Sequence, residues 1–275
     1  MGTFDILNLR INGVDFNNNL LRGKGDAAWN TGEIFNVFKQ WSKLKEYYSN
    51  DWKKLDHEDA LEKLIAGEVG MYFVGGFILG GLDEEEKEKF GVFRFPDVLN
   101  GEEKGNRITR AVDAPIDAFV MAGKSKKKKI ACDLLAFLAS EDAFDAYSKY
   151  NSGFIGIHKQ KSVSSNDDYL HDEVLQSAAS ILGSEEKITN YLDREMDNTF
   201  VKNVLIPKLE KFLAIKEPTD EFIARMLEKI QISWEPFKNS NSGLVMDQED
   251  MIDSVVTTRS DTSSLANNRF IQLDQ

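Results

Sequence analysis

The stretch "DAFVMAGKSKKKK" (residues 117–129) places a Gly-Lys-Ser triplet after an apolar run, as phosphate-binding loops of nucleotide-binding proteins do. Such a loop needs another glycine five residues before the Gly-Lys pair, because backbone N–H groups must wrap the phosphates. That position is Ala118. We therefore interpret 117–122 as a strand and 123–125 as a solvated turn into a helix. The apolar residues of this helix recur at helical spacing: Ile130, Leu134, Phe137 and Leu138.

The residues that bind metals or attack substrates are few. The chain has three histidines (His57, His158 and His171), none with a second ligand at a recognised metal-site spacing. Its one cysteine, Cys132, lies among apolar neighbours and is expected to be a small hydrophobe. We expect no metal, no cofactor and no catalytic residue.

Charge and composition exclude further classes. The 275-residue chain carries a net charge of -12, which argues against a nucleic-acid partner. No apolar run reaches the roughly 20 residues of a membrane span. The start, "MGTFDILNLRING", lacks the basic and apolar regions of a signal peptide, so we expect no signal peptide in this chain.

Several elements can be placed in the N-terminal half. Asn30 and Glu33 suggest a capping box for a helix with an apolar stripe from Ile34 to Tyr48. A second helix begins near Asp56 and stops at Gly67. "GMYFVGGF" (70–77) and "GVFRFP" (91–96) are predicted as strands, and 83–89 as a charged surface helix or loop.

The C-terminal half is predicted to be mainly helical. We expect helices around 172–182, over 198–214 with a kink at Pro207, and over 220–234 after Pro218-Thr219. From residue 236 to 275 the chain is mostly polar, which predicts a disordered tail.

The segment "ALEKLIAGEVGMYFVGGFILGGL" resembles a motif of extracellular solute-binding proteins of ABC sugar importers, the maltose-binding-like class. Further stretches follow in that family's order: "FGVFRFPDV", "DAFVMAGKSKKKKIACDLLAFLASEDAFDAY", "SGFIGIHK" and "PTDEFIARMLEKIQ". The resemblance covers roughly residues 30–234. It departs at Phe77, where Trp is usual, and at Gly156, where Pro or Ala is expected.

This resemblance implies a fold. It implies an α/β protein, the helix-rich C-terminal lobe of a two-lobed periplasmic-binding-protein type II fold, with an incomplete second lobe. Residues 1–112 and 165–235 would form the discontinuous C-terminal lobe. Residues 113–160 would be a strand-helix excursion belonging to the N-terminal lobe. Family members have over a hundred further residues before this region, so the chain is expected to be a truncated form.

The resemblance also implies a function. The chain would be the substrate-binding component of an ABC importer, which captures a mono- or oligosaccharide between the lobes and delivers it to the permease. It would be periplasmic or extracellular, and meet the membrane only through the permease. Two alternatives remain: a fragment that keeps the fold without function, and a carbohydrate-active enzyme. The enzyme is less favoured because Asp113 and Asp117 lack a general-acid context.

Binding residues follow from the same resemblance. Phe77 occupies the position of a ring that stacks on the sugar, and Gly75 and Gly76 would let the backbone approach the ligand. Asp117, and by a weaker argument Asp113, would accept hydrogen bonds from sugar hydroxyls. The alternatives are an ordinary core position for Phe77 and a capping or solvated role for Asp117.

Two further positions have competing interpretations. Arg194 falls where family members bring a polar residue to the ligand, although a surface salt bridge to Glu195 or Asp197 explains it equally well. Phe200 is either a second aromatic platform or a core residue, because its spacing from Val204 is helical.

Overall fold

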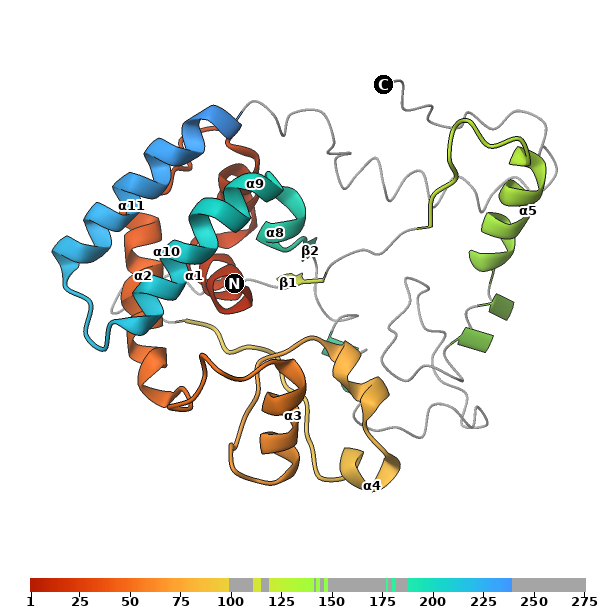
Figure 1. Cartoon of the computed structure of the whole chain (residues 1–275), viewed down its shortest axis with the longest axis horizontal. Helices are drawn as coiled ribbons and strands as arrows, with labels where there is room; N and C mark the ends of the chain where they lie inside the picture. The colour runs from red at the N-terminus through yellow and green to blue at the C-terminus, as the bar shows by residue number, and fades with distance from the viewer. Residues whose placement is uncertain are drawn as a thin grey trace.

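The computed structural model describes residues 1–98, 111–114, 119–140 and 187–238, with positions 142, 143, 146, 147, 177, 180 and 181 between them. In this part of the chain a helical bundle forms the core, and a helical layer of shorter elements lies beside it (Figure 1). The α-helices are α1 (Gly2–Arg22), α2 (Gly32–Leu44), α3 (His57–Ile65), α4 (Glu84–Lys87), α5 (Lys128–Leu138), α8 (Leu192–Glu195), α9 (Asn198–Phe200), α10 (Ile206–Ala214) and α11 (Asp220–Trp234). Short helical turns are η1 (Lys45–Tyr47), η2 (Gly76–Gly81), the π-helical η4 (Val201–Leu205) and η5 (Glu235–Phe237), and the strands are β1 (Ala111–Asp113) and β2 (Lys187–Thr189).

Helix α1 is one of the elements that the sequence did not indicate. All seven residues from Phe4 to Arg10 are buried, so its first half has no solvent face and no amphipathic stripe. Gly13 breaks the helix with φ 82° and ψ 174°, a backbone conformation that is almost confined to glycine. Across the break the Asn8 amide donates to Asn17 Oδ1 at 2.7 Å. The helix ends at Gly23, which is left-handed.

Helix α2 begins one residue later than the sequence suggested. The cap is Thr31, whose hydroxyl accepts from the Ile34 N–H, so the predicted capping box at Asn30 and Glu33 is wrong. The Asn30 amide instead donates to Glu228 on α11, at 2.9 Å. The predicted apolar stripe is confirmed by the burial of Ile34, Val37, Phe38 and Trp41.

Aromatic rings join segments that are distant in sequence. Phe4 stacks on Trp29 with ring centroids 5.4 Å apart, and Phe38 meets Phe212 edge-to-face at 4.8 Å. The backbone N–H of Trp29 donates to the side-chain oxygen of Gln231 at 2.7 Å. Helices α1 and α2 therefore share one core with α9, α10 and α11.

The C-terminal helices agree with the sequence. The helix expected over 198–214 is present as α9, the π-helical η4 and α10 in succession, and η4 ends just before Pro207 enters the first turn of α10. Helix α11 spans the expected residues, and the Thr219 hydroxyl caps it by accepting from the Phe222 N–H. The helix expected around 172–182 and the tail beyond 238 fall mostly or wholly outside the described residues.

The predicted strands at 70–77 and 91–96 are wrong. In the described part of the chain the sheet consists of β1 and β2 alone, which run parallel with Ala111 opposite Lys187 and Asp113 opposite Thr189. Residues 71–75 and 91–98 form no strand with a ladder of backbone hydrogen bonds, and Met71 and Phe93 are largely exposed. Residues 119–122 form no strand either. Alternating apolar residues make a strand only where a neighbouring strand supplies the backbone hydrogen bonds.

Helix α5 lies apart from the bundle (Figure 1). The turn predicted at 123–125 is confirmed: the Ser125 N–H donates to the Ala122 carbonyl at 2.9 Å, and the Ser125 hydroxyl accepts from the Lys127 N–H. The apolar face of α5 is exposed, to 67% at Ile130 and 56% at Phe137. None of the described helices has the length and apolar character needed to cross a bilayer.

Candidate functional site

Phe77 lies at the start of η2 and presents an accessible ring. Its side chain is 62% exposed, and one edge contacts the His57 ring at a centroid distance of 6.1 Å. A β-carbon added to Gly75 would lie 2.9 Å from Cδ1 of Phe77, so the ring packs directly over this glycine. Gly75 has an ordinary extended backbone, with φ -76° and ψ 156°. Glycine is therefore required at position 75 because a side chain there would collide with the Phe77 ring, and not because of its backbone conformation.

Residues 91–95 lie beside residues 71–75, the segment that precedes Phe77. Phe73 meets Phe95 edge-to-face at 5.5 Å, which brings 71–75 and 91–95 together. Phe73 is 48% exposed and Phe93 is 64% exposed. We call residues 71–77 and 92–95 the aromatic surface. Ring faces that are open to solvent can stack on the apolar face of a sugar ring.

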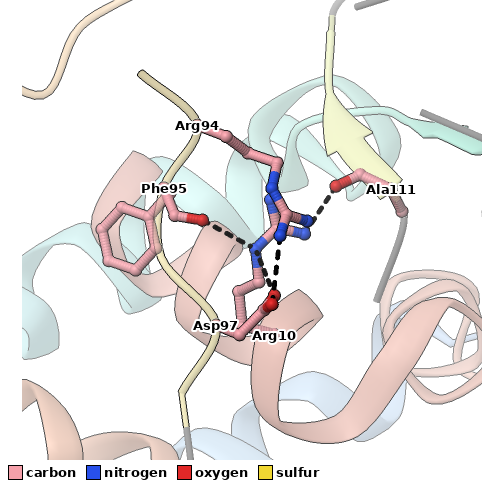
Figure 2. Close-up of polar contacts among 5 residues, drawn as sticks. All are labelled: Arg10, Arg94, Phe95, Asp97 and Ala111. Atoms are coloured by element: carbon pink, nitrogen blue, oxygen red, sulfur yellow. Dashed lines mark hydrogen bonds and ion pairs between the residues drawn. The ribbon is translucent and has the colours of Figure 1, made fainter. Parts of the chain in front are cut away.

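Arg10 attaches the aromatic surface to the sheet (Figure 2). Its Nε donates to the Phe95 carbonyl at 3.2 Å, and Nη1 donates to the Ala111 carbonyl of β1 at 2.6 Å. Asp97 lies 4.0 Å from Arg10 Nε and accepts from Arg94 at 3.0 Å. Arg10 was not among the predicted site residues, and its one sign in the sequence is its position at the end of the mainly apolar stretch "FDILNLR".

Asp113 ends β1 and belongs to a buried acidic group. The Thr189 hydroxyl on β2 donates to Asp113 Oδ1, while Oδ2 is buried without a hydrogen-bond partner in the described structure. Burial raises the pKa of Asp113 to about 6, and the Thr189 hydrogen bond and the Arg10 charge partly oppose that rise. Burial and the neighbouring Asp113 also raise the pKa of Asp5 well above its ordinary value. Burial, with Asp113 next in effect, raises the pKa of Tyr191 to about 12.

The remaining predicted residues lie elsewhere. Arg194 is exposed on α8. Phe200 has no exposed surface and packs on Trp234 at 4.7 Å, which fits the core alternative and leaves no ring face for a ligand. Asp117 lies outside the described residues. Within the described part, no group of three or more His, Cys, Asp or Glu side chains is arranged to hold a metal ion.

The structure thus links two of the predicted site elements. Phe73 and Phe77 belong to the same segment, residues 71–77. Phe73 contacts Phe95, whose carbonyl accepts a hydrogen bond from Arg10. Arg10 in turn binds Ala111, two residues before Asp113. An exposed aromatic segment and a buried carboxyl group are therefore held by one connected set of contacts.

Comparisons with known proteins bear on the family and the fold of this chain. The model of a family described as bacterial extracellular solute-binding protein matches residues 2–170. A solved structure of the bacterial solute receptor AcbH, a protein with an exclusive substrate preference for β-D-galactopyranose, is similar at 23% sequence identity and a TM-score of 0.65. The match covers 86% of this chain and 57% of that chain, so this chain spans less than two thirds of the receptor. No curated protein sequence matches significantly. At this identity the likeness concerns the fold alone, and it confirms the expected helix-rich part of a two-lobed fold.

Proposed function

This chain belongs to the family of bacterial extracellular solute-binding proteins, and from that premise we propose that it is the substrate-binding component of an ABC importer. It captures a sugar in a cleft between two lobes and delivers it to the membrane permease. The site of action is the periplasm or the cell exterior. The protein binds its ligand without transforming it.

The exposed Phe77 ring, held over Gly75, is the observation that carries the proposal. A sugar ring has an apolar face of C–H groups, which an aromatic ring can cover. Exposing a large aromatic ring to water is unfavourable by about 25 cal/mol per Å² of apolar surface. A ring kept in this position by a glycine is suited to a ligand that covers it.

Polar residues would fix the orientation of the sugar. Asp117, two positions before the described residues 119–122, is proposed as an acceptor for sugar hydroxyls. Asp113 is the weaker candidate, because its Oδ1 already accepts from Thr189 and its Oδ2 is buried in the described structure. Arg194, exposed on α8, is the third proposed polar contact. The proposal does not use Phe200, because its ring is enclosed in the core.

Isothermal titration with mono- and disaccharides tests this function. Galactose is the first probe, because AcbH prefers β-D-galactopyranose. Phe77→Ala and Asp117→Ala are compared with Tyr47→Ala, a control whose ring is 84% exposed outside the aromatic surface. We expect each site variant to weaken affinity by about tenfold, the equivalent of about 1.4 kcal/mol. Tyr47→Ala should leave affinity unchanged.

Two results would contradict the proposal. Folded chain that shows no saturable binding to any sugar of the panel would favour a fragment without binding function. Release of reducing sugar from an oligosaccharide during incubation would favour the carbohydrate-active enzyme. Because variant affinities are compared as ratios, the test remains valid if the chain binds weakly.

A further inference from the structure

A groove between α10 and α11 carries a positive charge that the proposed function does not use. Its volume is about 310 Å³, which is at the lower end of the range for small-molecule sites. We call it the basic groove. Its lining includes four cationic side chains, one acidic side chain and one aromatic ring: Lys208, Lys211, Arg225, Lys229, Glu221 and Phe222.

The charge of the basic groove is opposite to that of the chain. The protein has a net charge of -12, yet four lining side chains are positive and one is negative. That one acid, Glu221, forms an ion pair with Arg225 at 2.6 Å. Among the lining residues, three lysines therefore have no acidic counterpart in the groove itself. Like charges gathered in one place repel each other, and an anion bound between them relieves the repulsion.

The cations stand on two facing walls. Lys208 and Lys211 are about one turn apart on α10, and Arg225 and Lys229 are one turn apart on α11. An anion in the groove would meet donors from both helices. Phe222 gives the groove an apolar part, and Lys211 Nζ lies 6.0 Å from the centroid of its ring.

We propose that the basic groove binds a small molecule that carries a phosphate group and an apolar portion. The phosphate would lie between the lysines of the two walls, and the apolar portion would cover the Phe222 ring. The limited volume and the strongly negative charge of the whole chain disfavour a nucleic acid. This site uses none of the residues assigned to the sugar.

Titration calorimetry with phenyl phosphate and with inorganic phosphate tests the proposal. Phenyl phosphate should bind saturably and more tightly than inorganic phosphate, because only the former covers Phe222. The double variant Lys208→Gln/Lys229→Gln should weaken phenyl phosphate binding by at least about tenfold, through loss of charge-assisted hydrogen bonds from both walls. Phe222→Leu should remove the advantage of phenyl phosphate over inorganic phosphate.

The matched control is Lys202→Gln/Lys216→Gln, which removes two exposed charges outside the groove. It should retain wild-type affinity for phenyl phosphate. Equal weakening in both double variants would mean general charge attraction and would overturn the proposal, as would the absence of saturable binding. Phe77→Ala should leave phenyl phosphate binding unchanged, so a failure here is distinguishable from a failure of sugar binding.

Discussion

Arg10 Nη1 donates to the carbonyl oxygen of Ala111 at 2.6 Å, across 101 positions of the sequence. The same guanidinium donates through Nε to the Phe95 carbonyl, so one side chain on α1 fixes both β1 and the aromatic surface. The Arg10 side chain is 1% exposed. A buried cation of this kind stabilises a fold only while its acceptors stay in place.

Replacing Arg10 by Met should destabilise the protein. The substitution keeps an apolar stem but leaves the buried carbonyl of Ala111 and the partly buried carbonyl of Phe95 without their donor, at a cost of about 2–5 kcal/mol in unfolding free energy. Urea denaturation measures this change. Arg225→Met, which removes an exposed ion pair, is the control and should cost less than about 1 kcal/mol. Equal effects of the two substitutions would contradict the structural role of Arg10.

Replacing Gly75 by Ala should weaken sugar affinity without unfolding the protein. The new β-carbon would lie 2.9 Å from Phe77 Cδ1, so the ring must turn away from its present position. The backbone of Gly75 is open to alanine, and the unfolding free energy should change by less than about 1 kcal/mol. Gly70→Ala is the control, because an added β-carbon there meets nothing within 4 Å. Unchanged sugar affinity in Gly75→Ala would show that the orientation of the Phe77 ring does not contribute to binding.

Local signals explain which elements the sequence revealed. Helix α11 was predictable because Thr219 caps it, two acids occupy its first turn and its apolar residues share one face. Helix α1 was not, since burial on all sides removes the periodicity on which such predictions depend. The candidate site was predicted only in part. Phe77 and its glycines are close in sequence, whereas the Arg10 contacts join residues 85 and 101 positions apart.

Stability should fall as the pH rises from about 4 to 6, in part because of Asp113. Its pKa is about 6 in the folded protein, against an ordinary value of 3.8. In that window the folded state holds a proton that the unfolded state has lost, so raising the pH favours unfolding by up to about 1.4 kcal/mol per pH unit. Asp5 contributes in the same direction.

Asp113→Asn tests this pH dependence and keeps an acceptor for Thr189. Urea denaturation of wild type and variant between pH 4 and 7 gives the two profiles. The variant should lose part of the decline with rising pH, while Asp5 maintains the remainder. Parallel profiles would mean that Asp113 does not hold a proton in the folded protein.

The exposed face of α5 should promote self-association. Ile130 and Phe137 lie on one side of this helix, with Leu134 between them, and all three are more than half exposed. Contiguous apolar surface of this kind favours contacts between molecules. Light scattering should show an apparent mass that rises with concentration. Ile130→Glu with Phe137→Glu should suppress the rise, whereas Lys124→Glu with Lys126→Glu should not. A constant mass in wild type would contradict this expectation.

The hydrogen bond between Trp29 and Gln231 has a consequence for biosynthesis. It joins residues 202 positions apart, and Trp234, three residues further on, is enclosed in the same core. A nascent chain therefore cannot complete this core until α11 has left the ribosome. Until then the rings of Phe4, Trp29 and Phe38 lack their partners, and contacts of such long range also slow folding. A chain whose translation stalls within α10 should be held by chaperones or lost to aggregation, even though α1 and α2 are already complete.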